Sequence, residues 1–241
     1  MKKQTVLMYH AIEYPPQDAG AQTYCVKMHN FREQMELIKQ GQSPAGTVPV
    51  ITFDDGDITN YTKAYPVLKE LGLKAYFFIL ASNVGKANYM NWEQIKKLSN
   101  AGMIIGSHGM THHILTSLKA DDLAFEVEKS KQIIEEKINS PVEYFSVPKG
   151  YYNKRVIDAV KKAGYKKMFT SDLDKNNEFI VGRIAVKAYW TKQYFKQVIT
   201  KGVPLKGRVV DNIKKNAKKL FGNSFYHNLR EAILSKNGKE K

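Results

Sequence analysis

The sequence of 241 residues contains a single cysteine, Cys25. One cysteine excludes an internal disulfide and every zinc module that is built from several cysteines. Any metal ion bound by this chain would therefore be held by histidine and carboxylate side chains. A reducing compartment fits this composition, although the composition does not require one.

Long apolar runs are also absent from the sequence. The N-terminal stretch reads MKKQTVLMYHAIEYPP, and its apolar run Val6–Met8 ends at Tyr9 and His10. That run is shorter than the apolar core of a secretory signal, and nowhere do the roughly 18 apolar residues of a membrane-spanning helix follow one another. We therefore expect a cytoplasmic protein.

Positive charge is concentrated at the C-terminal end. The net charge is +15, and the chain from residue 190 onward contributes 13 Lys or Arg against 3 Asp or Glu. We expect residues 1–190 to form the main domain and residues 191–241 a basic helical appendage. Such a tail suits peripheral contact with an anionic membrane surface, or it is simply a solvated helix face. No nucleic-acid motif accompanies the charge, so no nucleic acid is expected as a partner.

Short apolar runs recur along the chain and are nearly continuous rather than alternating, which is typical of strands buried on both faces. The predicted strands cover residues 5–9, 48–53, 75–80, 103–107, 142–147, 167–171 and 183–186. Helical patterns lie between them, at residues 60–71, 92–100, 119–138 and 153–163. This alternation predicts a parallel α/β fold, either open or closed into a barrel.

Polar residues follow several of these predicted strands. His10 follows the first strand, Asp54 and Asp55 follow the second in the stretch TFDDG, and His108 follows the fourth. The stretch PKG follows the fifth strand. Because the carboxyl ends of parallel strands form the active-site rim in such folds, we expect these residues to converge on one face.

The stretch SHGMTHH contains two histidines four residues apart, His108 and His112. Two imidazoles at this spacing can share one ion, and a carboxylate from Asp54 or Asp55 would complete a three-ligand site with an open position for water. The alternative is that these are loop histidines without a ligand. If Asp55 binds the ion, Asp54 can act as general base towards the bound water.

With these residues in place, the sequence resembles the polysaccharide deacetylase family, also called the NodB-homology or carbohydrate esterase 4 family. The stretch TFDDG matches its first motif, HGMTHHIL matches its His-x-x-x-His motif, and FSVPKG is a degraded form of its third motif. The resemblance covers roughly residues 1–187. It implies a distorted (β/α)7 barrel, here with a basic helical C-terminal extension.

The resemblance also implies roles for single residues. Asp54 would be the general base, and Asp55, His108 and His112 would bind a divalent ion, with Zn²⁺ expected and Co²⁺ or Ni²⁺ as alternatives. The reaction would be attack of metal-bound water on an N-acetyl group of an N-acetylhexosamine-containing glycan. The segment Pro148, Lys149 and Gly150 would bind substrate and supply a backbone N–H to the oxyanion.

Two parts of the family pattern are missing. The third motif lacks the arginine that orients the base and has Ser146 or Val147 in its place. The late Leu-x-His motif that supplies the general acid is absent from RIAVKAYW, where only Lys187 stands near the expected position. We therefore expect Asp54 to lack arginine support and the acid to come from another segment.

The N-terminal stretch LMYH offers a replacement for that acid. Its His10 resembles the relocated histidine of the poly-N-acetylglucosamine deacetylase branch, in which the third motif also lacks arginine. His10 is the expected general acid, against the alternative of a structural histidine at the strand end, and His113 is the second choice. Two other functions stay open: a different amide or ester hydrolase acting on O-acetyl or imide substrates, and an impaired glycan-binding protein.

Overall fold

The computed structural model describes residues 4–13, 22–41, 48–173 and 175–204. Within these residues the chain forms one eight-stranded sheet in which all pairings are parallel. The strands are β1 (Val6–Tyr9), β2 (Val50–Phe53), β3 (Ala75–Ile79), β4 (Ile104–Ser107), β5 (Tyr144–Ser146), β6 (Lys167–Thr170), β7 (Ile180–Gly182) and β8 (Ile184–Ala185).

The sheet curves into a nearly closed barrel with the strand order β7-β6-β5-β4-β3-β2-β1-β8. Its two ends meet in one segment, because only Arg183 separates β7 from β8. β7 pairs with β6, and β8 pairs with β1. The expected seven-stranded barrel is therefore confirmed, with a seventh strand that changes partner at Arg183 and begins three residues before the predicted start.

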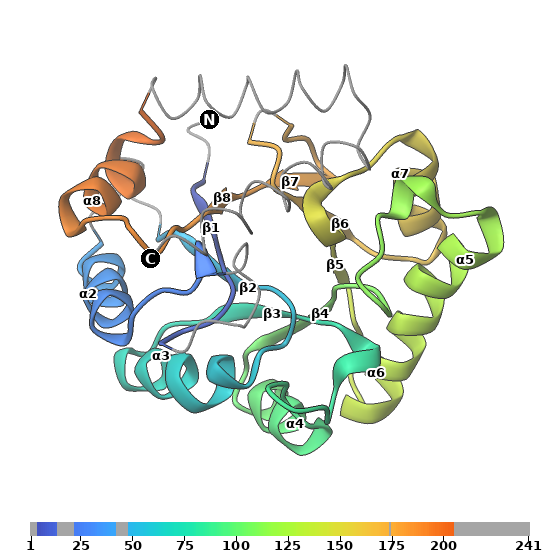
Figure 1. The fold of residues 1–241 in the computed structure, drawn as a ribbon, viewed down its shortest axis with the longest axis horizontal. Coiled ribbons are helices and arrows are strands. Elements are labelled where there is room, and N and C mark those ends of the chain that lie inside the picture. The colour runs from blue at the N-terminus through green and yellow to red at the C-terminus, as the bar shows by residue number, and fades with distance from the viewer. Residues whose placement is uncertain (1–3, 14–21, 42–47, 174, 205–241) are drawn as a thin grey trace, which may run out of the picture.

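Helices cover the outside of the curved sheet (Figure 1). They are α2 (Met28–Lys39), α3 (Tyr65–Leu71), α4 (Trp92–Asn100), α5 (Ala120–Ala124), α6 (Ser130–Ile138), α7 (Lys154–Lys162) and α8 (Lys192–Lys201). A π-helical turn, Asn60–Ala64, precedes α3, and a second one, Phe125–Lys129, joins α5 to α6. The long helix predicted at residues 119–138 is thus interrupted, and α2 was not predicted individually.

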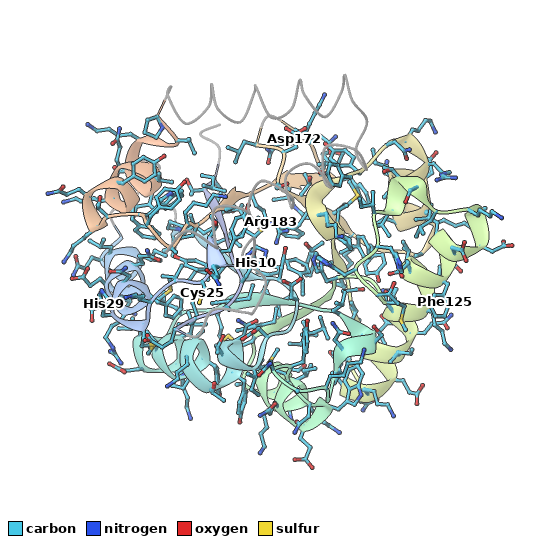
Figure 2. The ribbon with its side chains drawn as sticks, in the orientation of Figure 1. His10, Cys25, His29, Phe125, Asp172 and Arg183 are labelled. Carbon is cyan, nitrogen blue, oxygen red and sulfur yellow. The ribbon has the colours of Figure 1, made fainter. Side chains whose placement is uncertain are left out.

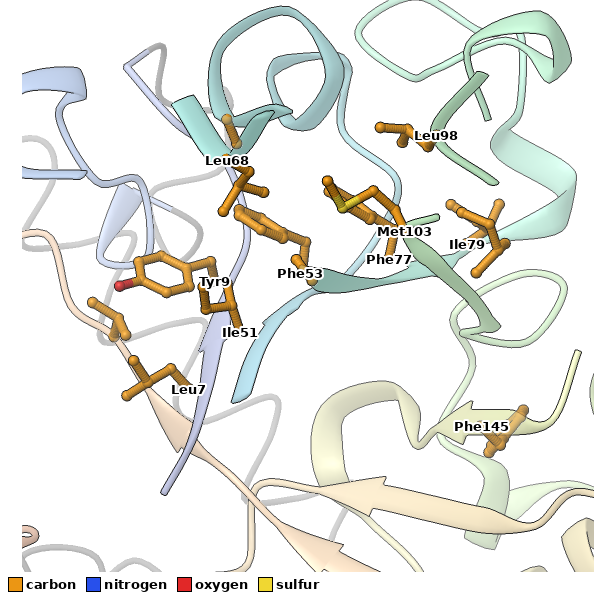
Figure 3. Close-up of a cluster of buried hydrophobic side chains, with 14 of the residues drawn as sticks. Leu7, Tyr9, Ile51, Phe53, Leu68, Phe77, Ile79, Leu98, Met103 and Phe145 are labelled. Atoms are coloured by element: carbon orange, nitrogen blue, oxygen red, sulfur yellow. The ribbon is translucent and has the colours of Figure 1, made fainter. Parts of the chain in front are cut away.

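The hydrophobic core has two parts because successive residues of a strand point to opposite faces. Phe53 and Phe77 point outward towards the helices, with their rings stacked 4.9 Å apart (Figure 3). Phe78, the next residue, packs inside the barrel against Phe169 at 5.0 Å. A Cβ atom at Gly106 would lie 2.5 Å from the Phe78 ring, so glycine is needed there to admit this ring.

The first described part of the predicted appendage is α8, which packs against α2 with Phe195, Val198 and Ile199 buried. Most of the basic tail lies outside the described residues, so the domain boundary after residue 190 and the membrane contact stay predictions. In the described part of the chain, no helix has the length and apolar character needed to cross a membrane.

Candidate active site

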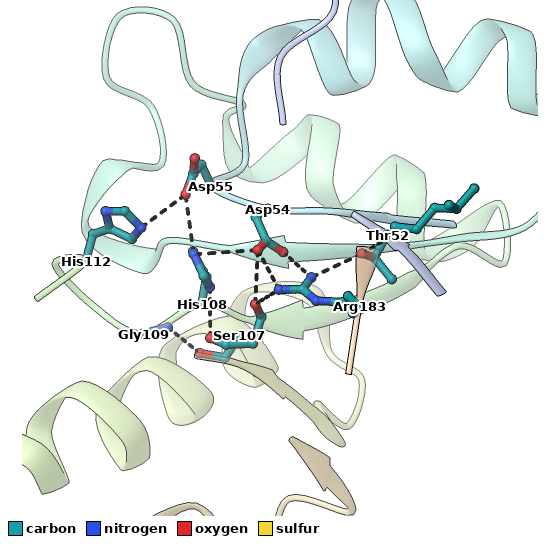
Figure 4. A network of polar contacts seen from close by, with 10 residues as sticks. Thr52, Asp54, Asp55, Ser107, His108, Gly109, His112 and Arg183 are labelled. Carbon is teal, nitrogen blue, oxygen red and sulfur yellow. Dashed lines mark hydrogen bonds and ion pairs between the residues drawn. The ribbon is translucent and has the colours of Figure 1, made fainter. Parts of the chain in front are cut away.

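The polar residues expected at the strand ends do gather at one end of the barrel (Figure 4). Asp54 and Asp55 follow β2, and His108 follows β4. His112 lies on the loop after β4, where its backbone adopts a left-handed conformation with φ of 65°. One residue that was not expected, Arg183, joins them from the junction of β7 and β8.

Asp54 is buried, with 2% of its surface exposed, and both of its carboxylate oxygens are bonded. Arg183 donates from Nη1 to Oδ1 and from Nη2 to Oδ2, each at 2.7 Å. The Ser146 hydroxyl donates to Oδ2 at 3.2 Å. Burial works to raise the pKa of Asp54, but Arg183 and His108 outweigh it and the pKa is lowered. Asp54 is therefore held ionised in one orientation, as a proton acceptor must be.

Arg183 is itself almost completely buried, and its guanidinium is fixed from several sides. It donates to Thr52 Oγ1 at 3.1 Å and to Ser146 Oγ at 2.7 Å. Its guanidinium carbon lies 5.3 Å from the centre of the Phe78 ring, on the aromatic side chains that fill the barrel. A buried guanidinium needs such a paired and hydrogen-bonded environment, because an isolated one would be costly.

The expectation that Asp54 lacks arginine support is therefore wrong. The third motif has no arginine, and Ser146 stands at its position, but the guanidinium arrives from a different strand and Ser146 bridges the two groups. The available signal was an arginine directly before the apolar run IAV, in a segment predicted to be buried. A charged residue in such a position is almost always paired, and no basic partner had been assigned to Asp54 from the sequence.

His108 is oriented by a backbone contact. Its Nδ1 lies 2.8 Å from the carbonyl oxygen of Ser146, which can only accept, so Nδ1 carries the proton. In the uncharged ring, Nε2 is then the nitrogen with a lone pair; burial works to lower the pKa of His108, but Asp54 and Asp55 outweigh it and the pKa is raised. Nε2 lies 3.4 Å from Asp55 Oδ1 and 3.9 Å from Asp54 Oδ2. A histidine whose second nitrogen donates to a carbonyl is the usual arrangement of a metal ligand.

His112 approaches the same carboxylate oxygen from the other side, with Nε2 3.5 Å from Asp55 Oδ1. Burial lowers the pKa of His112 to about 4 against the opposing effect of Asp55. The ring is therefore uncharged at neutral pH and has a lone pair to offer. Its side chain remains 34% exposed, so this side of the site is open to solvent.

Asp55, His108 and His112 together fit a divalent ion. One ligand atom from each lies within 4.8 Å of the others. Among the described residues, Oδ1 of Asp55 is a buried atom without a hydrogen-bond partner. Burial works to raise the pKa of Asp55, but His108 and His112 outweigh it and the pKa is lowered. The two imidazole nitrogens and the unsatisfied carboxylate oxygen together form a donor set for zinc or a similar ion.

His10 lies directly after β1, inside the ring of helices (Figure 2). Its ring centre is 5.0 Å from that of Tyr24, and its backbone carbonyl accepts a hydrogen bond from Asn60 Nδ2 at 2.6 Å. Its Nδ1 is buried and, within the described residues, has no hydrogen-bond partner. Burial lowers the pKa of His10, while Asp55 and Asp54 act in the opposite direction. Both carboxylates therefore favour the protonated form of His10, but burial has the larger effect.

The other expected residues lie at the same end of the barrel. Pro148–Gly150 forms a 3₁₀ turn after β5, with Lys149 left-handed at φ of 57°. The Gly150 N–H already donates to the Val147 carbonyl at 3.1 Å. His113, the second choice for the acid, has its Nδ1 3.6 Å from Glu126 Oε1. The roles of these residues stay predictions.

Comparison with known proteins identifies relatives of this chain. YxkH of Bacillus subtilis is 29% identical over 181 residues, which are 70% of this chain and 65% of YxkH. The poly-beta-1,6-N-acetyl-D-glucosamine N-deacetylase of Staphylococcus aureus is 25% identical over 192 residues, which are 72% of this chain and 66% of the relative. The chain thus spans just under two thirds of these relatives' lengths.

The fold is shared with solved structures as well. The deacetylase PplD of Streptococcus pyogenes, solved in complex with acetate, matches with a TM-score of 0.74 at 24% identity, over 82% of this chain and 98% of PplD. A model of the polysaccharide deacetylase family matches residues 41–168, more than half of the chain. This segment includes Asp54, Asp55, His108 and His112. The resemblance found in the motifs is thereby confirmed, and the chain belongs to the polysaccharide deacetylase family.

Proposed function

We propose that this protein is a divalent-metal-dependent hydrolase that removes N-acetyl groups from a glycan containing N-acetylhexosamine. The observation that carries the proposal is the pairing of two differently held carboxylates. Asp54 is bound on both oxygens by Arg183, whereas Asp55 presents an unsatisfied oxygen between two histidines. One acid is prepared to accept a proton, and the other is prepared to bind a cation.

The proposed ligands of the ion are Asp55, His108 and His112. A divalent ion bound by them would supply a Lewis acid for the amide carbonyl and would lower the pKa of a bound water. We assign Zn²⁺ as the ion because the set of two imidazoles and one carboxylate, with room for water, is typical of catalytic zinc.

Asp54 is the proposed general base. Arg183 and Ser146 hold its carboxylate in one orientation, so it need not reorganise when it takes a proton from the attacking water. The fork of Arg183 keeps Asp54 ionised before that transfer. Arg183 is thus proposed as a positioning residue that acts through Asp54.

His10 is the proposed general acid that protonates the departing sugar amine. Its position directly after β1 supports this assignment, and Asp55 and Asp54 counteract the burial that lowers the pKa of His10. The turn Pro148–Gly150 is the proposed contact for the acetyl oxygen and the sugar, since it follows β5 beside Ser146. The similarity to the Staphylococcus aureus poly-beta-1,6-N-acetyl-D-glucosamine N-deacetylase supports a polymeric substrate of N-acetylglucosamine.

Acetate release tests the proposal. The purified chain, loaded with Zn²⁺, should release acetate from oligomers of N-acetylglucosamine and leave acetylxylan untouched. Asp54→Asn should retain the ion and lose turnover, whereas Asp55→Ala should lose both. Turnover by Asp54→Asn at the rate of the unmodified chain would exclude Asp54 as the base, and preferential cleavage of acetylxylan would exclude the N-acetyl substrate.

A further inference from the structure

The loop that joins the two histidine ligands is held along its backbone. Between His108 and His112, the carbonyl of Gly109 accepts from Ala81 N at 3.1 Å. The carbonyl of Met110 accepts from Ser82, both from its backbone N at 3.1 Å and from its Oγ at 2.5 Å. One side of this loop is therefore fixed to the segment that follows β3.

A single carboxylate, Glu126, holds the other side. Its Oε2 accepts hydrogen bonds from the backbone N–H of Met110 at 2.8 Å and from that of Thr111 at 3.0 Å. Its Oε1 accepts from the Thr111 hydroxyl, and His113 Nδ1 lies 3.6 Å away. Glu126 is only 3% exposed and lies in the turn that joins α5 to α6. Hydrogen bonds from backbone N–H to an ionised acceptor are about twice as strong as neutral ones.

The loop is shaped to receive this carboxylate. Gly109 has φ of 83°, and a Cβ atom there would lie 2.9 Å from Glu126 Oε2. Glycine therefore permits both the left-handed backbone and the close approach of the carboxylate. His112, three residues further on, has the second left-handed backbone of the loop, at φ of 65°.

Glu126 comes from the π-helical turn Phe125–Lys129, and that turn is stabilised by other residues. Ser130 Oγ donates to the carbonyl of Glu126 at 2.7 Å, and Tyr165 Oη donates to that of Val127 at 3.0 Å. Ser130 Oγ also lies 2.7 Å from Ser107 Oγ, at the end of β4. Single π turns inside α-helices are frequent at functional sites. Phe125, the first residue of this turn, lies at the outer edge of the molecule in Figure 2.

We infer that Glu126 is a positioning residue for the metal site: it fixes the backbone between His108 and His112 and so determines how tightly this histidine pair binds a divalent ion. The inference rests on the metal site of the proposed function. Glu126 contacts neither histidine ligand directly, and its effect passes through the N–H groups of Met110 and Thr111. Residues that orient metal ligands typically change the affinity by a factor of about 10–100 when they are removed.

Zn²⁺ titration of the full chain by calorimetry tests this inference without any substrate. Glu126→Ala should bind Zn²⁺ at least about tenfold more weakly than the unmodified chain. Glu126→Gln should restore most of the affinity, because its amide oxygen can still accept from both N–H groups. Glu128→Ala is the matched control, since Glu128 lies in the same π turn and makes no hydrogen bond or ion pair within the described residues. It should bind Zn²⁺ as the unmodified chain does.

A merely structural role of Glu126 would lower the melting temperature of the metal-free protein without changing the Zn²⁺ affinity of the folded chain, and that result would overturn the inference. Should Glu126→Ala fail to fold, the variant Thr111→Val tests the inference in its place. It removes one hydrogen bond to Glu126 and should weaken Zn²⁺ binding about threefold; unchanged affinity would overturn the inference. Failure of the unmodified chain to bind Zn²⁺ would instead overturn the metal site itself.

Discussion

The two halves of the active site are built in opposite ways. The base half, made of Asp54 and Arg183, is buried and bonded on every carboxylate oxygen. The ligand half consists of Asp55, His108 and His112. His108 is buried, but the side chains of Asp55 and His112 are about one third exposed, and Asp55 keeps a carboxylate oxygen without a hydrogen-bond partner in the described structure. The base half is thus completed by the protein itself, whereas the ligand half has donor atoms that a divalent ion would satisfy.

Among the substitutions that test this difference between the two halves, that of Arg183 should have the largest effect. Arg183→Met leaves the carboxylate of Asp54 buried without its partner, and we expect a loss of about 3–5 kcal/mol in the free energy of unfolding, measured with urea. The double variant with Asp54→Asn should recover part of that loss, because the unpaired charge is then gone. The matched control is Arg32→Met, which breaks the exposed bidentate pair with Glu70 and should change stability little. Equal losses in both arginine variants would show that burial does not distinguish the two pairs.

His10 is the proposed general acid, and its replacement should separate catalysis from ion binding. His10→Ala should lower kcat by about 100-fold or more, because it removes the proton donor for the leaving amine. Zn²⁺ affinity should stay within about twofold of that of the unmodified chain, since His10 is outside the ligand set. Loss of Zn²⁺ binding in this variant would place His10 among the ligands instead.

Metal removal should affect only the ligand half. Zn²⁺ at 100 times its Kd should stabilise the folded state by about 2.7 kcal/mol, which thermal melting with and without a chelator would detect. Asp55→Ala should abolish this shift, and Asp54→Asn should retain it. A shift of unchanged size in Asp55→Ala would mean that the ion binds elsewhere.

Crowding inside the barrel next to Arg183 should have the smallest effect. Gly106→Ala would place a methyl group 2.5 Å from the Phe78 ring, on which Arg183 lies. Overpacking of this kind costs about 1–3 kcal/mol, and denaturant unfolding would measure it. Gly106 is not left-handed, so its loss would come from crowding; Gly85→Ala is the opposite case, with φ of 83° and nothing within 4 Å of a Cβ atom, and gives the cost of backbone strain without crowding. A loss confined to Gly85→Ala would show that the barrel interior has room to spare.

The sequence predicted the ligand half better than the base half, and the reason is physical. Residue type and local spacing were enough to single out Asp55, His108 and His112 as candidate ligands, and the structure brings one ligand atom of each within 4.8 Å of the others. Arg183 was missed because its pairing with Asp54 joins positions 129 residues apart. Its position before the apolar run IAV indicates a paired arginine, but no local pattern identifies Asp54 as the partner, and the neighbouring Lys187 was considered instead.

The helices, too, could be predicted only in part. The apolar positions Leu123, Val127, Ile134 and Ile138 of the segment 119–138 are all buried, as their spacing predicts. That spacing did not reveal the π turn inside the segment, because one additional residue in a turn hardly disturbs an apolar pattern. Glu126, which this turn carries into the interior, belongs to no motif that would single it out in the sequence.

The split seventh strand has a consequence for substitutions that lie outside the site. β7 pairs with β6, β8 pairs with β1, and Arg183 is the single residue between them. The orientation of Asp54 therefore depends on the closure of the barrel, because its guanidinium partner is held at this junction. A substitution that weakens the pairing of either short strand would disturb the Asp54 carboxylate through Arg183, without touching any residue beside that carboxylate.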